Sequence, residues 1–321
     1  MRRMLTLPDI LASRPRIASE IRATPLVESH WLSALADADV RLKLESLQVC
    51  NTFKARGALN ALRRLVERHS GSTLPEVVTA SAGNHGRGIA WAAERCGLHA
   101  TIFTPRQAPR AKLEAIARHG ADLRAIAETY EDSELLALEF AKTTGATYVS
   151  PYNDDDVIAG AGTTAVEILE HWPDVEVVIA PVGGGGLITG VAVAVKGMKP
   201  SAQVIGAEAD ASPVFTSSLR AGRLVQVEVR PTIADGLAGN AEVDTRTWPY
   251  VRDLVNRVVA VPEADLRAGL RSLLAEEHLV AEGAGVAGVA AVAAGLMPRG
   301  RRTAIIVSGS NIDFSRLREC L

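Results

Sequence analysis

The sequence lacks the features that mark secreted, membrane-spanning and nucleic-acid-binding proteins. Its cysteines, Cys50, Cys96 and Cys320, show neither paired nor metal-binding spacing, so nothing indicates a disulfide framework or a thiolate metal centre. The longest apolar stretches, such as 286–297, are rich in alanine and glycine and too short to span a bilayer. Residues 1–5 include basic side chains, but no apolar segment of a signal peptide follows them. We therefore expect a cytoplasmic protein.

A charge excess of either sign is also absent. The chain has 35 basic and 37 acidic residues, for a net charge of −2. No segment forms a dense basic stripe, so a nucleic acid is not expected as a partner. Hydrophobic residues make up 47% of the chain, which is typical of a globular protein, and 321 residues are enough for about two domains.

What is present is a regular alternation of short β-branched runs and amphipathic helical stretches. Strand–helix units follow one another in residues 76–150, and their helices end at glycines. The alternation then resumes with a helix expected near 163–171 and continues to a last strand at 303–307, while the segment from about 222 to 250 looks like loop. This order predicts an α/β fold with doubly wound, mostly parallel sheets in two lobes. We assign 76–150 to a small domain, and 1–75 together with 151–321 to a large one.

One lysine lies where a helix is expected to begin. Lys54 follows a strand expected at 40–44 and opens a helix that runs towards Val66. The side chain of Asn51 or Thr52 can cap this helix. Because the helix dipole disfavours a cation in the first turn, we expect a lowered pKa for Lys54 and a larger fraction of neutral, nucleophilic amine. The alternative is an ordinary surface lysine.

A run of four glycines, Gly183, Gly184, Gly185 and Gly186, follows an apolar strand expected at 175–180 and opens another helix. Backbone N–H groups of such a run can converge on an anion at the helix N-terminus, where the dipole favours negative charge. The run has neither the Walker lysine nor the spacing of a dinucleotide fingerprint. It predicts a phosphate site of another kind; the alternative is a tight turn between strand and helix.

Two further strands end in small polar residues. Residues 81–86 (Ser-Ala-Gly-Asn-His-Gly) follow one expected strand, and 308–311 (Ser-Gly-Ser-Asn) follow the last one. The carboxyl ends of parallel strands line the ligand crevice of an open sheet, so the first loop can bind a carboxylate and Ser308 can offer a hydroxyl to a ligand. Taken singly, these segments could also be a capped helix start and an ordinary turn.

These four segments can converge on one anionic, carbonyl-bearing cofactor. Pyridoxal phosphate fits, because it offers an aldehyde to Lys54, a phosphate to the glycine run and a ring nitrogen to Ser308.

The chain also resembles the fold type II pyridoxal-phosphate enzymes, and within them the serine/threonine dehydratase and serine racemase group. The matching segments, in order, are 22–26, 42–45, 53–58, 81–86, 158–163, 181–186, 234–236, 282–285 and 308–311. The resemblance implies a tryptophan synthase beta-like fold of two lobes. The large domain would bind the cofactor, and the small domain would lie on the substrate side.

The resemblance further implies a role for each matching residue. Lys54 would be the catalytic residue and would attach the cofactor. Four other elements would bind the cofactor: Phe53 against its ring, Asn84 at its 3′-oxygen, Gly183 to Gly186 at its phosphate, and Ser308 at its ring nitrogen. The residues of the substrate site would be Ser81, Ala82, Asn84 and His85.

The residues at two of these positions indicate a reaction. A neutral hydroxyl at Ser308 supplies no charge that would keep the cofactor ring protonated, so expulsion of a β-substituent is favoured. Serine racemases that resemble this chain carry a serine where Ala82 stands, and alanine cannot transfer a proton. We therefore expect an ammonia-lyase that dehydrates and deaminates a β-hydroxy L-amino acid, L-threonine or L-serine, to a 2-oxo acid and ammonia.

Four alternatives stay open. They are a serine racemase, a dehydratase of another 3-hydroxy amino acid such as 3-hydroxyaspartate, a β-replacement transferase, and a non-catalytic ligand-binding protein. Many relatives also bind a divalent cation, but of its ligands only Glu208 is present, and Val214 stands where a second acidic residue is expected. Such a cation is therefore only a possibility. The resemblance suggests a homodimer.

Overall fold

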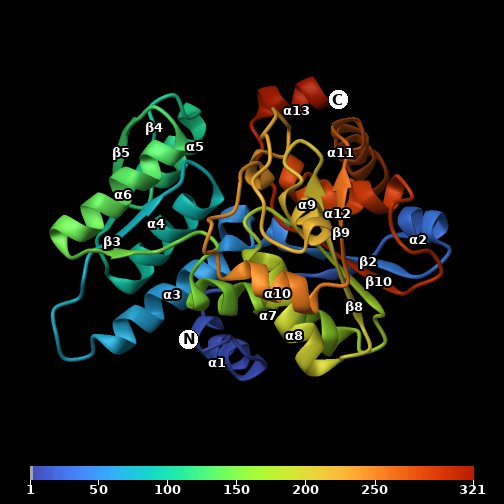
Figure 1. Cartoon of the computed structure of the whole chain (residues 1–321), viewed down its shortest axis with the longest axis horizontal. Helices are drawn as coiled ribbons and strands as arrows, with labels where there is room; N and C mark the ends of the chain where they lie inside the picture. The colour runs from blue at the N-terminus through green and yellow to red at the C-terminus, as the bar shows by residue number, and fades with distance from the viewer. Residues whose placement is uncertain (1–2) are drawn as a thin grey trace.

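The computed structural model describes residues 3–321, which form two sheets and their flanking helices (Figure 1). The larger sheet has six strands in the order β1-β2-β10-β7-β8-β9. These strands are β1 (Leu26–Glu28), β2 (Val40–Leu44), β7 (Val177–Pro181), β8 (Gln203–Ala209), β9 (Arg257–Val261) and β10 (Thr303–Val307). Neighbouring strands run parallel, except that β1 pairs antiparallel with β2.

The smaller sheet has four parallel strands in the order β5-β4-β3-β6. Its strands are β3 (Val77–Ala80), β4 (Ala100–Pro105), β5 (Asp122–Ala127) and β6 (Thr147–Tyr148). Together with α4 (Asn84–Cys96), α5 (Arg110–Ala117) and α6 (Tyr130–Thr144), it forms the separate lobe at the left of Figure 1. The predicted α/β fold with mostly parallel sheets in two lobes is confirmed.

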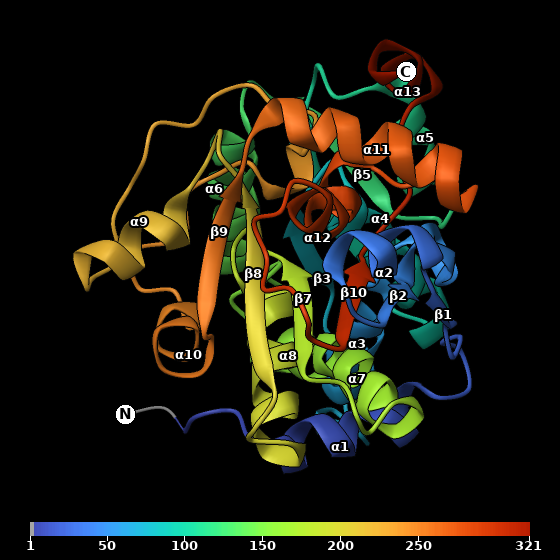
Figure 2. The same cartoon turned by 90° about the vertical axis from the view of Figure 1, so that its right-hand side faces the viewer.

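Helices cover both faces of the large sheet (Figure 2). One face carries α1 (Leu7–Ile17), α7 (Asp155–His171), α8 (Gly186–Met198), α9 (Val214–Ala221) and α10 (Thr247–Leu254). The other carries α2 (His30–Ala36), α11 (Glu263–Glu277), α12 (Gly283–Ala293) and α13 (Phe314–Cys320). In β10, Ala304 and Ile306 join the first core while Ile305 and Val307 join the second, which explains why the whole strand is apolar.

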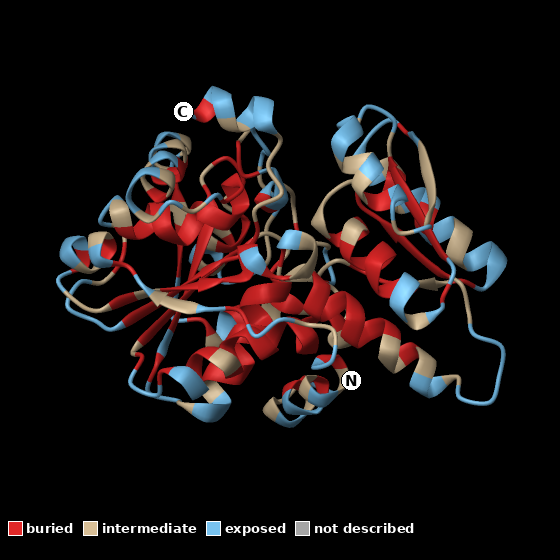
Figure 3. Cartoon of the chain, turned by 180° about the vertical axis from the view of Figure 1, so that it is seen from behind, coloured by how far each residue is buried: buried red, intermediate tan, exposed pale blue. Residues whose placement is uncertain are grey.

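Helix α3 (Lys54–Arg68) leads from the large sheet to the small lobe. It shares a buried cluster with α4, in which Leu59, Leu62 and Ile89 are fully covered. Figure 3 shows the buried strands and inner helices of both lobes, with exposure concentrated on their outer helices. The start of α3, where Lys54 lies, is thereby held by packing from both lobes.

Some elements differ from those expected from sequence. The helix predicted from about residue 163 begins at Asp155, because the Asp154 carboxylate accepts the N–H groups of Asp156 and Val157 at 2.8 and 3.0 Å. The segment 222–250, which reads as loop, contains a short 3₁₀ helix and the start of α10. Within residues 3–321, no helix is long and apolar enough to cross a membrane.

Candidate active site

Contacts with the residues that follow β10 hold Lys54 at the carboxyl end of that strand. Thr52 forms an isolated antiparallel bridge with Gly309, and the N–H of Phe53 donates to the Ser308 carbonyl at 3.0 Å. Lys54 then begins α3, as predicted, and Phe53, the residue directly before the helix, makes no side-chain cap. The predicted contribution of Thr52 is present, because its hydroxyl accepts the N–H of Lys54 at 3.4 Å. Because β10 lies between β2 and β7, Lys54 is held at the carboxyl ends of central parallel strands.

The amine of Lys54 is shielded from water. Its Nζ donates to the carbonyl of Pro151 at 2.7 Å and lies 5.2 Å from the centroid of the Phe53 ring. Burial of the ammonium lowers the pKa of Lys54 to about 8, and the Glu282 carboxylate opposes this shift. The predicted direction is confirmed, but desolvation, not the helix dipole, is the main cause.

The glycine run lies between β7 and α8 and is closely covered. Gly185 has a φ of 87°, which a residue with a Cβ rarely adopts. A Cβ on Gly184 would lie 2.3 Å from the ring of Tyr152. The hydroxyl of Thr247 donates to the Gly184 carbonyl at 2.9 Å and fixes the loop from the other side. Larger residues would therefore displace the walls of this loop.

The same run leaves backbone donors free. Among the described residues, the N–H groups of Gly183, Gly184 and Gly185 have no hydrogen-bond partner, and α8 has no side-chain cap. Ser308, at the end of β10, is buried with 4% of its surface exposed. Free N–H groups at a helix N-terminus, a shielded amine and a buried hydroxyl fit the phosphate, aldehyde and ring nitrogen of pyridoxal phosphate.

The loop between β3 and α4 supplies a second set of donors. The hydroxyl of Ser81 accepts the N–H of Gly83 at 3.1 Å, and this bond shapes the loop. Ala82, the residue between them, is half-buried. In the described chain, the N–H groups of Asn84 and His85 have no partner. This helix start can bind a carboxylate.

The side chain of His85 does not take part as a donor to a carboxylate. Its Nε2 lies 3.0 Å from the Val149 carbonyl, and because a carbonyl only accepts, Nε2 carries the proton. Nδ1 is buried, and no residue of the described range 3–321 bonds to it. Burial, and then the charge of Lys54, lowers the pKa of His85 to about 3, so its ring is neutral. Any contact of His85 with a substrate carboxylate therefore comes from its main chain.

The sequence reasoning missed three residues of the site. Pro151 and Tyr152 follow the small lobe, and they join the Lys54 amine to the glycine loop through the contacts given above. Glu282 precedes α12, and its Oε1 accepts Asn84 Nδ2 at 2.6 Å. Burial raises the pKa of Glu282 to about 7. Its presence in the matching segment 282–285 was the available signal, whereas Pro151 carries none because only its carbonyl is used.

Glu208 does not offer a cation site. Its carboxylate, 1% exposed, accepts the N–H groups of Phe215 and Thr216 at 3.0 and 2.7 Å, and Val214 provides no side-chain oxygen. Among the described residues, no group of three or more acidic, histidine or cysteine side chains could hold a metal ion. The set present does not fit a hard divalent cation, which needs several oxygen ligands. Glu208 instead caps α9.

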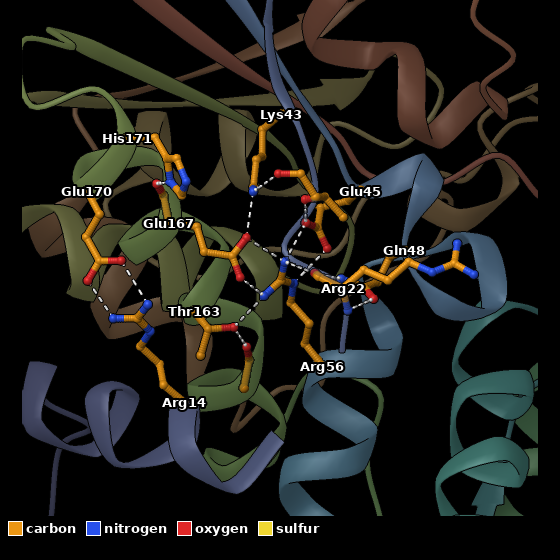
Figure 4. Close-up of polar contacts among 12 residues, drawn as sticks. Arg14, Arg22, Lys43, Glu45, Gln48, Arg56, Thr163, Glu167, Glu170 and His171 are labelled. Atoms are coloured by element: carbon orange, nitrogen blue, oxygen red, sulfur yellow. Dashed lines mark hydrogen bonds and ion pairs between the residues drawn. The ribbon is translucent and has the colours of Figure 1, made fainter. Parts of the chain in front are cut away.

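A buried ion network lies around Arg56, in the first turn of α3 (Figure 4). The Arg56 guanidinium, 1% exposed, forms ion pairs with Glu45 at 2.8 Å and Glu167 at 2.6 Å. Lys43 Nζ pairs with Glu167 at 2.6 Å and also donates to the Thr24 carbonyl. Two positive and two negative side chains thus tie β2, α3 and α7 together two residues after Lys54. These charges are fully paired, which is how proteins tolerate buried ions.

The fold and the site are typical of a cofactor-dependent α/β enzyme, with a buried lysine and a glycine-rich loop at a helix start. A family model described as "Pyridoxal-phosphate dependent enzyme" matches residues 17–309. The chain belongs to this family, so pyridoxal phosphate is its cofactor, as predicted.

Curated relatives are similar over nearly the whole chain. An L-threonine ammonia-lyase from Thermotoga maritima is 42% identical, covering 98% of this chain and 77% of the relative. A catabolic L-threonine dehydratase from Escherichia coli K12 is 33% identical, with 98% and 95% covered.

Solved structures agree with this fold. Maize serine racemase superposes with a TM-score of 0.89 at 32% identity, covering 99% of this chain and 98% of the other. The processed form of threonine deaminase isoform 2 from Solanum lycopersicum gives 0.89 at 33%, covering 98% and 91%. The chain is therefore similar both to threonine lyases and to a racemase.

Proposed function

We propose that this chain dehydrates and deaminates a β-hydroxy L-amino acid, L-threonine or L-serine, to a 2-oxo acid and ammonia. The names of the relatives, an ammonia-lyase at 42% identity among them, support this reaction. The structural observation that carries it is the shielded amine of Lys54, because a pKa of about 8 leaves a useful neutral fraction near neutral pH.

The residues that would hold the cofactor are those predicted from sequence: Phe53, Lys54, Asn84, Gly183 to Gly186 and Ser308. When bound, pyridoxal phosphate supplies an aldehyde for amino groups and a ring that withdraws electrons from the α-carbon of the substrate. The N–H groups of the glycine run would donate hydrogen bonds to its phosphate. Ser308 offers a neutral hydroxyl, which favours loss of a β-substituent over prolonged storage of negative charge at the α-carbon.

The substrate carboxylate would bind at the start of α4. Ser81 and the N–H groups of Asn84 and His85 belong to the same loop and helix start. The proposed contact of His85 uses its main-chain N–H, not its ring. Lys54 Nζ would then remove the α-proton. The β-hydroxyl would leave with a proton as water, so that the α-hydrogen and the β-hydroxyl are lost together as one water molecule. A later addition of water would release ammonia and the 2-oxo acid.

The alternative function is racemisation. It is supported by the likeness to maize serine racemase and to a pyridoxal 5′-phosphate-dependent aspartate racemase. A racemase needs a proton donor on the face of the α-carbon opposite its base. The methyl group of Ala82 cannot serve, so we propose that Lys54 is the sole α-proton base.

Three further assignments belong to this proposal. Residues 1–75 and 151–321 would form the cofactor-binding domain, and 76–150 the substrate-side domain. The enzyme would act as a cytoplasmic homodimer.

The test is a substrate panel assayed for 2-oxo acid, ammonia and inverted amino acid. It contains both enantiomers of threonine, serine and 3-hydroxyaspartate. We expect 2-oxo acid from L-threonine or L-serine and little D-isomer. Rapid D-serine formation would instead make the chain a racemase, and turnover of 3-hydroxyaspartate alone would move the proposal to another dehydratase. Purified protein that stays colourless with pyridoxal phosphate would contradict the site as a whole.

A further inference from the structure

Four side chains form one continuous hydrogen-bond chain across the two lobes. Arg87 Nη1 donates to Asn311 Oδ1 at 2.6 Å, and Asn311 Nδ2 donates to Asn84 Oδ1 at 2.7 Å. Asn84 Nδ2 in turn donates to Glu282 Oε1 at 2.6 Å. Asn84 and Arg87 belong to α4 of the small lobe, whereas Glu282 precedes α12 and Asn311 follows β10 in the large lobe.

Groups that bond to the two amides fix the direction of this chain. The Arg87 guanidinium can only donate hydrogen bonds, and the main-chain carbonyl of Cys50 can only accept them. An amide side chain can do either, so its orientation follows from its partners. Asn311 is fixed a second time, because its Nδ2 also donates to the Cys50 carbonyl at 2.8 Å and its main-chain N–H donates to Glu282 Oε2 at 3.1 Å. The orientation of the Asn84 amide is therefore dictated from both sides.

This orientation decides what Asn84 offers to the cofactor. Its carbonyl oxygen faces Asn311, and one N–H is used by Glu282, so one N–H is left. The 3′-oxygen of pyridoxal phosphate carries negative charge when ionised and needs a donor. A reversed amide would present a carbonyl oxygen and repel it.

We propose that Glu282 and Asn311 are positioning residues that hold the Asn84 amide so that its remaining N–H points to the cofactor 3′-oxygen, with Arg87 fixing Asn311. This inference rests on the proposed role of Asn84 and adds the residues that make it possible. The cluster also joins the two lobes, because Asn84 lies in the small lobe and its two partners lie in the large one.

Exchanging the amide and the carboxylate of Asn84 and Glu282 tests this pair directly in the full-length chain. Asn84→Asp sets two carboxylates face to face, so Tm should fall and cofactor affinity should drop by roughly tenfold or more. In Asn84→Asp/Glu282→Gln, the new glutamine amide can donate to the new carboxylate, so Tm should recover. Cofactor affinity should stay low, because the donor to the cofactor 3′-oxygen is lost with the Asn84 amide.

Matched variants sharpen the reading. Asn84→Asp/Glu276→Gln changes an exposed glutamate of α11 instead and should restore nothing. Arg87→Met should lower cofactor affinity by about fivefold, and Arg95→Met, at an exposed position of the same helix, should leave it unchanged. Affinity is measured by titrating pyridoxal phosphate and following visible absorbance, and Tm by thermal unfolding.

Two results would overturn the inference. Recovery of both Tm and cofactor affinity in the swapped double variant would show that the Asn84 N–H is not needed. No recovery of Tm would show that Glu282 is not the partner that matters. If the wild-type chain binds the cofactor but forms no 2-oxo acid, the proposed reaction fails while the swap result still stands.

Discussion

Two clusters of buried charged side chains, one around Arg56 and one around Lys54, lie close together in the chain but have opposite properties. Behind α3, Arg56 is directly paired with two carboxylates, and Lys43 completes a neutral set. In the site, Lys54 has a carbonyl as its partner, and Glu282 acts on it without an ion pair within 4.0 Å. The clusters thus differ in whether each charge has a direct counter-charge.

The pKa values follow this difference. Burial, the largest single cause, tends to raise the pKa of Glu167, but the hydrogen bonds and charges of Arg56 and Lys43 together outweigh it, and the pKa is lowered. In the site, burial prevails: the pKa of Lys54 falls to about 8 and that of Glu282 rises to about 7. Paired side chains stay ionised and hold elements of the fold together. Side chains without a direct counter-charge have pKa values near neutral pH and can exchange protons.

The largest effect is expected where the unpaired amine is removed. Lys54→Ala should abolish the visible absorbance of lysine-bound cofactor and lower kcat by about 10⁴-fold or more, because both attachment and the α-proton base are lost. Arg56→Met serves as its comparison, since that variant should keep the absorbance in whatever protein remains folded. Normal turnover by Lys54→Ala would remove Lys54 from the mechanism.

The paired cluster should show its effect in stability. Arg56→Met leaves Glu45, which is 0% exposed, without its counter-charge, so we expect a loss of about 3–5 kcal/mol in the free energy of unfolding. The control is Arg14→Met, because the Arg14–Glu170 pair is exposed and should contribute below about 1 kcal/mol. Denaturant titration measures both. Equal losses in the two variants would contradict the contrast between buried and surface pairs.

Glu208 offers a third case, a buried carboxylate that accepts the main-chain N–H groups of Phe215 and Thr216 and has no cationic partner among the described residues. Burial raises its pKa to about 7 from an ordinary value of 4.5, so ionisation is less favourable in the folded chain than in the unfolded one. Its contribution to stability therefore falls as pH rises through the window from 4.5 to 7. Between pH values of about 5 and 8, the Tm of the wild type should drop relative to that of Glu208→Gln.

The wild type and Glu208→Gln also test whether Glu208 binds a divalent cation. Because the carboxylate of Glu208 is already bound by α9, adding Mg²⁺ or a chelator should leave the Tm of the wild type unchanged. A Tm that rises with Mg²⁺ in the wild type but not in Glu208→Gln would mean that Glu208 is a ligand after all.

Periodic features were predictable from sequence, and convergent ones were not. The strands and the glycine-terminated helices follow from local patterns, and so does the position of Lys54 at a helix start. The short α9 was missed because eight residues flanked by Pro213 and a glycine give a weak periodic signal. The main cause of the Lys54 pKa shift was missed because it depends on burial by distant segments.

The orientation of side chains was the least predictable part. Asn84 and Asn311 were both visible in motifs, but nothing in a single sequence says that they bond to each other. His85 stays a predicted substrate residue through its main-chain N–H, but the sequence does not show that its ring donates to Val149, a residue of the segment that joins the lobes. Such contacts exist only once several strand ends have met.

The smallest effect is expected at a partly exposed pair between the lobes. Lys112 of α5 lies 2.5 Å from Asp235 of the large lobe, with side-chain exposures of 25% and 58%. Because such pairs contribute at most about 1 kcal/mol and are screened by salt, Lys112→Met should raise KM by up to about fivefold at low salt and less at high salt, with little change in kcat. Lys142→Met, at an exposed position of α6, is the control. A salt-independent fall in kcat would instead place Lys112 with the unpaired, reactive charges of the site, and the contrast between the two clusters would then extend across the lobe boundary.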